Sequence, residues 1–355
     1  MKTLTRRQFG LGIAAAAGAA LVAPRFTLAS NATRTFDEGR YVDINGIEQW
    51  VTIRGRDARN PVVVFLHGGP GLGMATAAPL FADWEARYTV VQWDQPRSGF
   101  THARNLSRDI GPLTLERFTA DALAVVNYVR KATGAKRVVL FGHSWGTLMG
   151  LTLARQHPEV VSAYVGTGQA VSGSRGSKLG YELALEAARK RGDTKAVEAL
   201  EKVGPPPYAT VEEFFVRQQY TNPPGLPSSA VAKEHNQALR KFMSAPLPQN
   251  AAYIPADAPK YDMLANFLDT QKLMYREAEK FEAASTLGYR YRVPIHFFEG
   301  EDDINVPVTL AREYFDRIEA PRKTFRTIAG AGHDTMAFHD ELLALFDSQV
   351  RPHLA

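Results

Sequence analysis

The sequence predicts an α/β fold in which helices flank a mostly parallel, eight-stranded sheet and a helical insertion interrupts the chain. Short apolar runs alternate with stretches of helical periodicity up to residue 166 and again after residue 293. Such alternation is typical of right-handed strand–helix–strand units. Residues 172–287 instead contain helical and proline-rich stretches without strand-like runs. We therefore expect a sheet domain, 30–171 and 288–355, with a helical cap, 172–287, over the carboxyl ends of the strands.

Local signals place the individual elements. An Asn-Gly pair, Asn45-Gly46, predicts a hairpin turn between two N-terminal strands. Continuous apolar runs predict strands that are buried on both faces. The expected strands are 40–44, 47–54, 61–66, 89–93, 138–141, 160–166, 293–298 and 324–328. The expected helices are 77–87, 113–131 with Thr114 as cap and Gly134 as stop, one after residue 144, 179–202, 261–284, 308–318 and 340–350.

The stretch from Lys136 to Leu153 contains the pattern Gly-x-Ser-x-Gly with Ser144 at its centre. An apolar strand precedes it and a helix rich in small residues follows. In this context the pattern predicts a nucleophile elbow, a sharp strand–turn–helix that exposes the serine hydroxyl. Glycines on both sides allow the close backbone approach that such a turn requires. The alternative is a glycine-rich turn with an incidental serine.

A serine nucleophile needs a base within hydrogen-bond reach and an acid that orients the base. After the strand 293–298, the loop Gly-x-x-Asp-x-x-x-Pro points to Asp303 as the acid, with Asp302 as the alternative. After the strand 324–328, a glycine-rich loop carries His333, which we expect to be the base. The chain order serine, acid, histidine is that of α/β-hydrolases.

An oxyanion intermediate also needs backbone N–H donors. We expect one from Trp145, the residue after the serine, and one from the glycine-rich loop after the strand 61–66. In that loop Gly69 is the first choice and Gly68 the second.

The N-terminus resembles a twin-arginine export signal. Paired arginines, Arg6-Arg7, precede a weakly apolar Ala/Gly-rich run, and Thr27-Leu28-Ala29 is a plausible cleavage site. The run is too short for stable membrane insertion, so an uncleaved anchor is the less favoured alternative. We expect residues 1–29 to engage the twin-arginine machinery and the protein to be exported, periplasmic or secreted. Their removal lowers the net charge from +5 to +1, which gives no argument for nucleic-acid binding. The chain has no cysteine, which excludes disulfides and thiolate metal sites.

Together these motifs resemble the proline iminopeptidase family of α/β-hydrolases. The resemblance rests on the loop 67–71 (HGGPG), 93–95 (WDQ), 142–146 (GHSWG), the Asp303 loop and Gly332-His333. It implies a small-molecule or short-peptide substrate, release of an N-terminal residue that is typically proline, a cap domain, and no metal or organic cofactor. The chain departs from the family at 96–98 (PRS), where an Arg-Gly pair is usual.

The family also uses cap carboxylates to hold the substrate's amine. Among the glutamates of the predicted cap, we take Glu182, Glu212 and Glu213 as candidates, with Glu186 as a further one. Each can equally be a solvated residue on a helix face.

The sequence therefore predicts a Ser144-His333-Asp303 hydrolase, most consistent with a prolyl aminopeptidase. The alternatives are a carboxylesterase, lactonase or amidase with the same catalytic residues, and a non-catalytic ligand-binding relative, against which the complete set of catalytic residue types argues.

Overall fold

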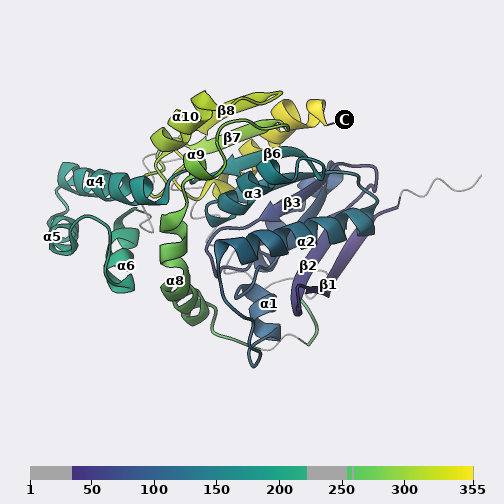
Figure 1. Ribbon diagram of the computed structural model, residues 1–355, viewed down its shortest axis with the longest axis horizontal. Coiled ribbons are helices and arrows are strands. Elements are labelled where there is room, and N and C mark those ends of the chain that lie inside the picture. The colour runs from purple at the N-terminus through teal and green to yellow at the C-terminus, as the bar shows by residue number, and fades with distance from the viewer. Residues whose placement is uncertain (1–33, 222–253, 258–259, 355) are drawn as a thin grey trace, which may run out of the picture. The chain divides into compact units, whose positions relative to one another are not determined.

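Eight strands of the described chain form one sheet in the order β1-β2-β4-β3-β5-β6-β7-β8 (Figure 1). The computed structural model describes residues 34–221, 254–257 and 260–354, so the predicted export signal and part of the predicted cap lie outside the described residues. Pairing is antiparallel for β1–β2 and β2–β4 and parallel for all the others. The strands are β1 Phe36–Ile44, β2 Ile47–Gly55, β3 Val62–Leu66, β4 Thr89–Trp93, β5 Val138–His143, β6 Val161–Thr167, β7 Ile295–Gly300 and β8 Lys323–Ile328. The mostly parallel, eight-stranded sheet predicted from the sequence is confirmed.

Helices pack on both faces of the sheet because successive strand residues point to opposite sides. In β3, Val62, Val64 and Leu66 join a core with helices of one face, whereas Val63 and Phe65 join a second core on the other. The first face is covered by α2 (Leu115–Thr133), α3 (Trp145–Gln156) and α10 (Val308–Arg317). The second is covered by η1 (Ala75–Phe81), η2 (Trp84–Ala86) and α11 (His339–Leu345), with η4 (Phe346–Val350) and η5 (Arg351–His353) after it.

Capping signals placed α2 correctly, whereas helical periodicity overestimated the helix expected at 77–87. The Thr114 hydroxyl accepts a hydrogen bond from the N–H of Arg117, and Gly134 ends α2 with a φ of 81°. At 77–87 the structure has the two short 3₁₀ helices η1 and η2. Pro79 inside η1 lacks the N–H that would continue an α-helix. The short helix α1 (Gly99–Arg104) was not predicted.

Between β6 and β7 the described chain is helical. The helices of this insertion are α4 (Gly173–Arg191), α5 (Thr194–Val203), α6 (Val211–Thr221), α8 (Met263–Lys280) and α9 (Ala283–Thr286). In Figure 1, α4, α5 and α6 lie together at one side, and α8 lies between α6 and the helices that cover the sheet. A Cβ at Gly173 would lie 2.1 Å from the carbonyl oxygen of Ala278, so α4 meets α8 at backbone distance. Among the described residues, no helix is both long and apolar enough to cross a bilayer.

Candidate active site

Ser144 occupies the sharp turn between β5 and α3, in a strained backbone conformation (φ 51°, ψ −118°). Its N–H donates to the carbonyl oxygen of Thr167 at 3.0 Å, which ties the turn to β6. A Cβ at Gly146 would lie 1.8 Å from the carbonyl oxygen of Leu66, and one at Gly142 would lie 2.9 Å from the carbonyl oxygen of Gly146. Both glycines of the motif are therefore required by the close packing of the turn against its neighbours.

Ser144, His333 and Asp303 form a continuous chain of hydrogen bonds. His333 Nε2 lies 2.8 Å from Ser144 Oγ, and His333 Nδ1 lies 2.8 Å from Asp303 Oδ2. The other carboxylate oxygen, Asp303 Oδ1, accepts the N–H groups of Asn305 and Val306, each at 2.9 Å. This is the arrangement of a nucleophile, a base and an orienting acid.

Burial and charge act in opposite directions on the imidazole. Burial lowers the pKa of His333, but the charge and hydrogen bond of Asp303 raise it, and the net direction is upward. Asp302, the alternative acid, is exposed, whereas Asp303 is 2% exposed. The local signal that separated these two neighbours, the spacing from Gly300, agrees with the geometry.

The turn after β6 packs against the imidazole of His333. A Cβ at Gly168 would lie 2.9 Å from His333 Cε1, so only glycine leaves room for the ring. The next residue, Gln169, donates its N–H to the buried carboxyl of Glu299 at 3.0 Å. Burial raises the pKa of Glu299 to about 8, so this group is neutral at neutral pH. Sequence reasoning gave no role to either residue.

The glycine-rich loop after β3 lies against the elbow. A Cβ at Gly68 would lie 3.1 Å from Ser144 Cβ, and Gly69 has a φ of 122°. His67 holds the loop, because its Nε2 accepts the N–H of Gln95 at 3.2 Å and its Nδ1 lies 2.7 Å from the carbonyl oxygen of Gly68. Burial lowers the pKa of His67 to about 4. A neutral ring with its proton on Nδ1 satisfies both bonds.

Trp145 is the first residue of α3. Backbone N–H groups in the first turn of a helix have no acceptor within that helix. Gly69, Ser144 and Trp145 line one cavity, and Gly68, Gly69 and Ser144 line a second.

Asp94 joins the loops after β3 and β4. Its carboxylate accepts the N–H groups of Met74, Ala75 and Phe100 at 2.8–3.1 Å. A Cβ at Gly99 would lie 2.1 Å from Asp94 Oδ2. Burial raises the pKa of Asp94 to about 6, although these hydrogen bonds oppose the rise. Asp94 and Gly99, which form this junction, both lie outside the segment 96–98 where the chain departs from the family.

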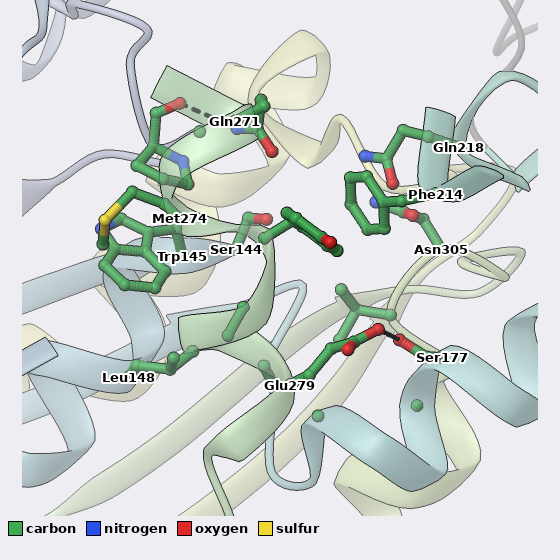
Figure 2. A pocket seen from close by; sticks show the side chains of 18 of the residues that line it. Ser144, Trp145, Leu148, Ser177, Phe214, Gln218, Gln271, Met274, Glu279 and Asn305 are labelled. Atoms are coloured by element: carbon green, nitrogen blue, oxygen red, sulfur yellow. Dashed lines mark hydrogen bonds between the residues drawn. The ribbon is translucent and has the colours of Figure 1, made fainter. Parts of the chain in front are cut away.

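A cavity of about 120 Å³ opens beside Ser144 between the elbow and the insertion (Figure 2). Apolar side chains from α3, α6, α8 and the acid loop line much of it: Leu148, Phe214, Met274, Tyr275 and Val306. Its polar side chains include Ser177, Arg217, Gln218, Gln271 and Glu279. Gln271 donates to the carbonyl oxygen of Pro70 at 2.8 Å, which connects α8 to the glycine-rich loop.

A second cavity, of about 260 Å³, meets the first at Ser144. Gly69, Ser144, Gln218 and Asn305 line both, but only the second includes His333. Its apolar lining comes from Leu72, Met74, Leu80, Phe267 and Met336. The nucleophile thus lines two cavities, and the imidazole lines one of them.

None of the three glutamates predicted to hold the substrate lines either cavity. Glu182 and Glu212 are exposed. Glu213 accepts the N–H groups of Ala209 and Thr210, so it caps the start of α6. Glu279 of α8 lies in the cavity instead, where burial raises its pKa and Ser177 Oγ donates to it at 3.4 Å. No local pattern distinguishes Glu279 from the other helix-face glutamates.

In the described part of the chain, no group of three or more His, Asp or Glu residues is placed to hold a metal ion.

The chain resembles known proteins over most of its length. Residues 61–340 match the family model for the alpha/beta hydrolase fold. A probable aminopeptidase of Bacillus subtilis is 24% identical over 88% of this chain and 94% of its own length. A proline iminopeptidase of Neisseria gonorrhoeae is 31% identical over 35% of this chain, and a probable proline iminopeptidase of Streptomyces coelicolor is 37% identical over 34%. The chain spans only 38% and 36% of the lengths of these last two proteins.

Solved structures agree on the fold. A proline iminopeptidase-related protein from Thermus thermophilus superposes with a TM-score of 0.58 at 21% identity, covering 90% of this chain and 100% of that one. A thermophilic esterase from Thermogutta terrifontis superposes with a TM-score of 0.52 at 16% identity, covering 91% and 99%. The resemblance to proline iminopeptidases indicated by the motifs is thereby confirmed. The chain belongs to the alpha/beta hydrolase fold family and is a hydrolase.

Proposed function

We propose that this hydrolase is a serine aminopeptidase that releases N-terminal proline, or a similar small residue, from peptides. The observation that carries the proposal is the hydrogen-bonded chain from Asp303 through His333 to Ser144. The names of the B. subtilis, N. gonorrhoeae and S. coelicolor relatives support the aminopeptidase class.

In the proposed reaction, Ser144 Oγ attacks the scissile carbonyl carbon while His333 Nε2 takes the hydroxyl proton. The Asp303 carboxylate stabilises the imidazolium that forms. The N–H groups of Gly69 and Trp145, with Gly68 as the second choice in the loop, hold the oxyanion. His333 then gives its proton to the leaving amine as the C–N bond breaks. A water molecule, activated by His333, releases the acyl group from Ser144.

The two cavities suggest where the parts of the substrate lie. The imidazole must reach the leaving amine, so the leaving group belongs in the cavity that contains His333. The acyl residue then occupies the cavity that contains Trp145 and Glu279, called the acyl-side cavity below. There the Glu279 carboxylate would pair with the free N-terminal amine, and Phe214 and Met274 would contact the proline ring.

One observation favours the alternative, a carboxylesterase, lactonase or amidase. Within the described residues, Glu279 is the sole carboxylate in the lining of the acyl-side cavity. A pair of carboxylates would hold an ammonium group more firmly, whereas a neutral acyl group needs none.

Four proteins and two substrates test the proposal. Proline p-nitroanilide reports aminopeptidase activity and p-nitrophenyl acetate reports esterase activity, each measured for the mature wild-type protein and for Ser144→Ala, Glu279→Gln and Glu182→Gln. We expect anilide turnover that Ser144→Ala abolishes. Glu279→Gln should raise KM for the anilide about tenfold or more and leave the ester unaffected, since it removes one charge-assisted hydrogen bond.

Glu182→Gln is the matched control, since Glu182 is exposed on α4 and outside the cavity. It should change neither reaction. If the wild type turns over only the ester, and Ser144→Ala abolishes that turnover, the protein is a carboxylesterase, lactonase or amidase and not an aminopeptidase. Activity that persists in Ser144→Ala would refute the catalytic assignment.

We also propose that residues 1–29 direct export through the twin-arginine machinery. The test is cell fractionation of the full chain and of a variant with Arg6→Lys and Arg7→Lys. Mature protein outside the cytoplasm only with the arginine pair would support the proposal. Equal export of the variant would contradict it.

A further inference from the structure

Arg217 of α6 places a positive charge in the acyl-side cavity. It lines the same cavity as Ser144 and Glu279, although its side chain is almost fully buried, at 4% residue exposure. One guanidinium nitrogen, Nη2, donates to the carbonyl oxygen of Asn305 at 2.8 Å. Nε has no hydrogen-bond partner among the described residues. Burial lowers the pKa of Arg217, but a guanidinium remains protonated in proteins.

Among the described residues, this cation has no anionic partner in direct contact. Glu279 and Asp303 act on Arg217 only through space. In the described chain neither forms an ion pair with Arg217. Glu279 instead accepts a hydrogen bond from Ser177, and Asp303 pairs with His333. A buried charge without a partner is costly, and a charge brought by a ligand relieves that cost. The geometry therefore leaves Arg217 short of an anion on the side of the nucleophile where the acyl group would lie.

The two charged groups of the cavity have opposite signs and remain apart. Figure 2 shows Ser144 and Glu279 around one cavity, with Ser177 beside Glu279. A carboxylate at one point and a guanidinium at another suit a ligand that carries an amine and a carboxylate together. Planar, bidentate contact with a carboxylate is the geometry that arginine favours.

We propose that Arg217 binds a carboxylate of the substrate, so that this hydrolase prefers acyl groups with an acidic side chain, such as an N-terminal aspartyl residue. The inference rests on the proposed function for bond cleavage and extends it to a further class of substrate. A carboxylate can also come from the free C-terminus of a dipeptide. The two sources share the same chemistry at Arg217 and are separated by the experiment below.

A purely structural role for Arg217 makes a different prediction. Its hydrogen bond to Asn305 connects α6 to the loop that also holds Asp303. If Arg217 only supported that loop, its loss would lower kcat for every substrate by the same factor. If it binds a carboxylate, its loss changes the ratio between acidic and neutral substrates.

The experiment compares matched pairs of substrates. The first pair is aspartyl and asparaginyl p-nitroanilide, which differ in the charge of the acyl side chain. The second pair is prolylglycine and prolylglycinamide, which differ in the charge of the leaving group. A third pair, p-nitrophenyl hemisuccinate and p-nitrophenyl butyrate, applies the same test to an esterase. The proteins are the wild type, Arg217→Met, Arg217→Gln and the control Arg189→Met, an exposed arginine of α4 outside the cavity.

We expect the wild type to favour the aspartyl substrate in kcat/KM by about tenfold or more, the effect of one charge-assisted hydrogen bond. Arg217→Met should bring this ratio close to one, and Arg189→Met should preserve it. Arg217→Gln, which keeps a donor for Asn305, gives the same readout if Arg217→Met fails to fold. A preference confined to prolylglycine, and lost with Arg217, would place the carboxylate at the C-terminus and would overturn both the preference for acidic acyl groups and the placement of the leaving group in the other cavity.

Wild-type ratios near one in all three pairs, or ratios unchanged without Arg217, would overturn the inference. Failure of the proposed function is distinguishable from this result. In that case both anilides and both dipeptides remain uncleaved, and the ester pair still reports on Arg217.

Discussion

His333 Nδ1 and Asp303 Oδ2 lie 2.8 Å apart, and the backbone of the acid loop fixes the carboxylate through its other oxygen. The bond sets the tautomer of the imidazole, because a proton on Nδ1 leaves Nε2 free to accept the proton of Ser144. Asp303 is held by its own loop whether or not His333 is present, so its effect on catalysis and its effect on folding can be separated.

Asp303→Asn should reduce kcat by about 10³–10⁴-fold, because the amide favours the wrong tautomer of His333. The midpoint of thermal unfolding should change little. The measurement is kcat with whichever substrate the wild type hydrolyses best. Asp302→Asn is the control, since Asp302 is exposed and outside the hydrogen-bonded chain. A larger loss of kcat in the Asp302 variant would show that Asp302, and not Asp303, is the catalytic acid.

The pH profile should reflect the raised pKa of His333. The base must be neutral to accept a proton, and the pKa of His333 lies above its ordinary value of 6.5. We therefore expect kcat/KM to rise with pH through a midpoint above 6.5. Asp303→Asn removes the charge that raises the pKa, so the residual activity of that variant should show a lower midpoint. Equal midpoints would contradict this electrostatic account.

Gly146→Ala should destabilise the fold, since its Cβ would lie 1.8 Å from the carbonyl oxygen of Leu66. Backbone atoms on both sides cannot move aside cheaply, so we expect a loss of about 3 kcal/mol or more in the free energy of unfolding. Denaturant titration measures it. Gly176→Ala is the control, because a Cβ there meets nothing within 4 Å. Similar stabilities for the two variants would show that the turn is looser than described.

His296 should make the fold sensitive to acid. This β7 residue is fully buried, and neither ring nitrogen has a partner among the described residues. Burial lowers its pKa to about 4, below the 6.5 of an unfolded chain. Between these values the unfolded state binds a proton that the folded state does not, so stability falls as pH falls.

His296→Leu should remove that dependence. Relative to the wild type, the variant should gain up to about 1.4 kcal/mol for each pH unit between 6.5 and 4. Comparing the two proteins cancels the contributions of the other buried groups. Urea titrations at pH 7, 5.5 and 4.5 measure the difference. A difference that stays constant with pH would show that His296 titrates normally in the folded protein.

Elements formed by interactions between residues close in the sequence could be predicted, whereas features formed by tertiary packing could not. Helix α2 was predicted to within two residues at each end because Thr114 and Gly134 act on adjacent backbone. The three catalytic candidates could be found because each follows a strand, and the carboxyl ends of parallel strands meet at one edge of the sheet. The two 3₁₀ helices were missed because Pro79 outweighed the helical pattern.

The residues proposed to bind the substrate could not be predicted in the same way. Glu279 and Arg217 come from α8 and α6, which a segment outside the described residues separates in the sequence, and they line one cavity only when the insertion packs. In the sequence, each looks like an ordinary charged residue on a helix face. Their burial is a property of tertiary packing, which no spacing rule contains.

The most direct test of the account is covalent labelling with a fluorophosphonate, followed by intact mass measurement and mapping of the modified residue. The account predicts one adduct per chain, on Ser144, with loss of hydrolysis in proportion to labelling. It also predicts no adduct in Ser144→Ala and slow labelling in Asp303→Asn. An adduct on another serine, or a fully labelled Ser144 with activity intact, would contradict it.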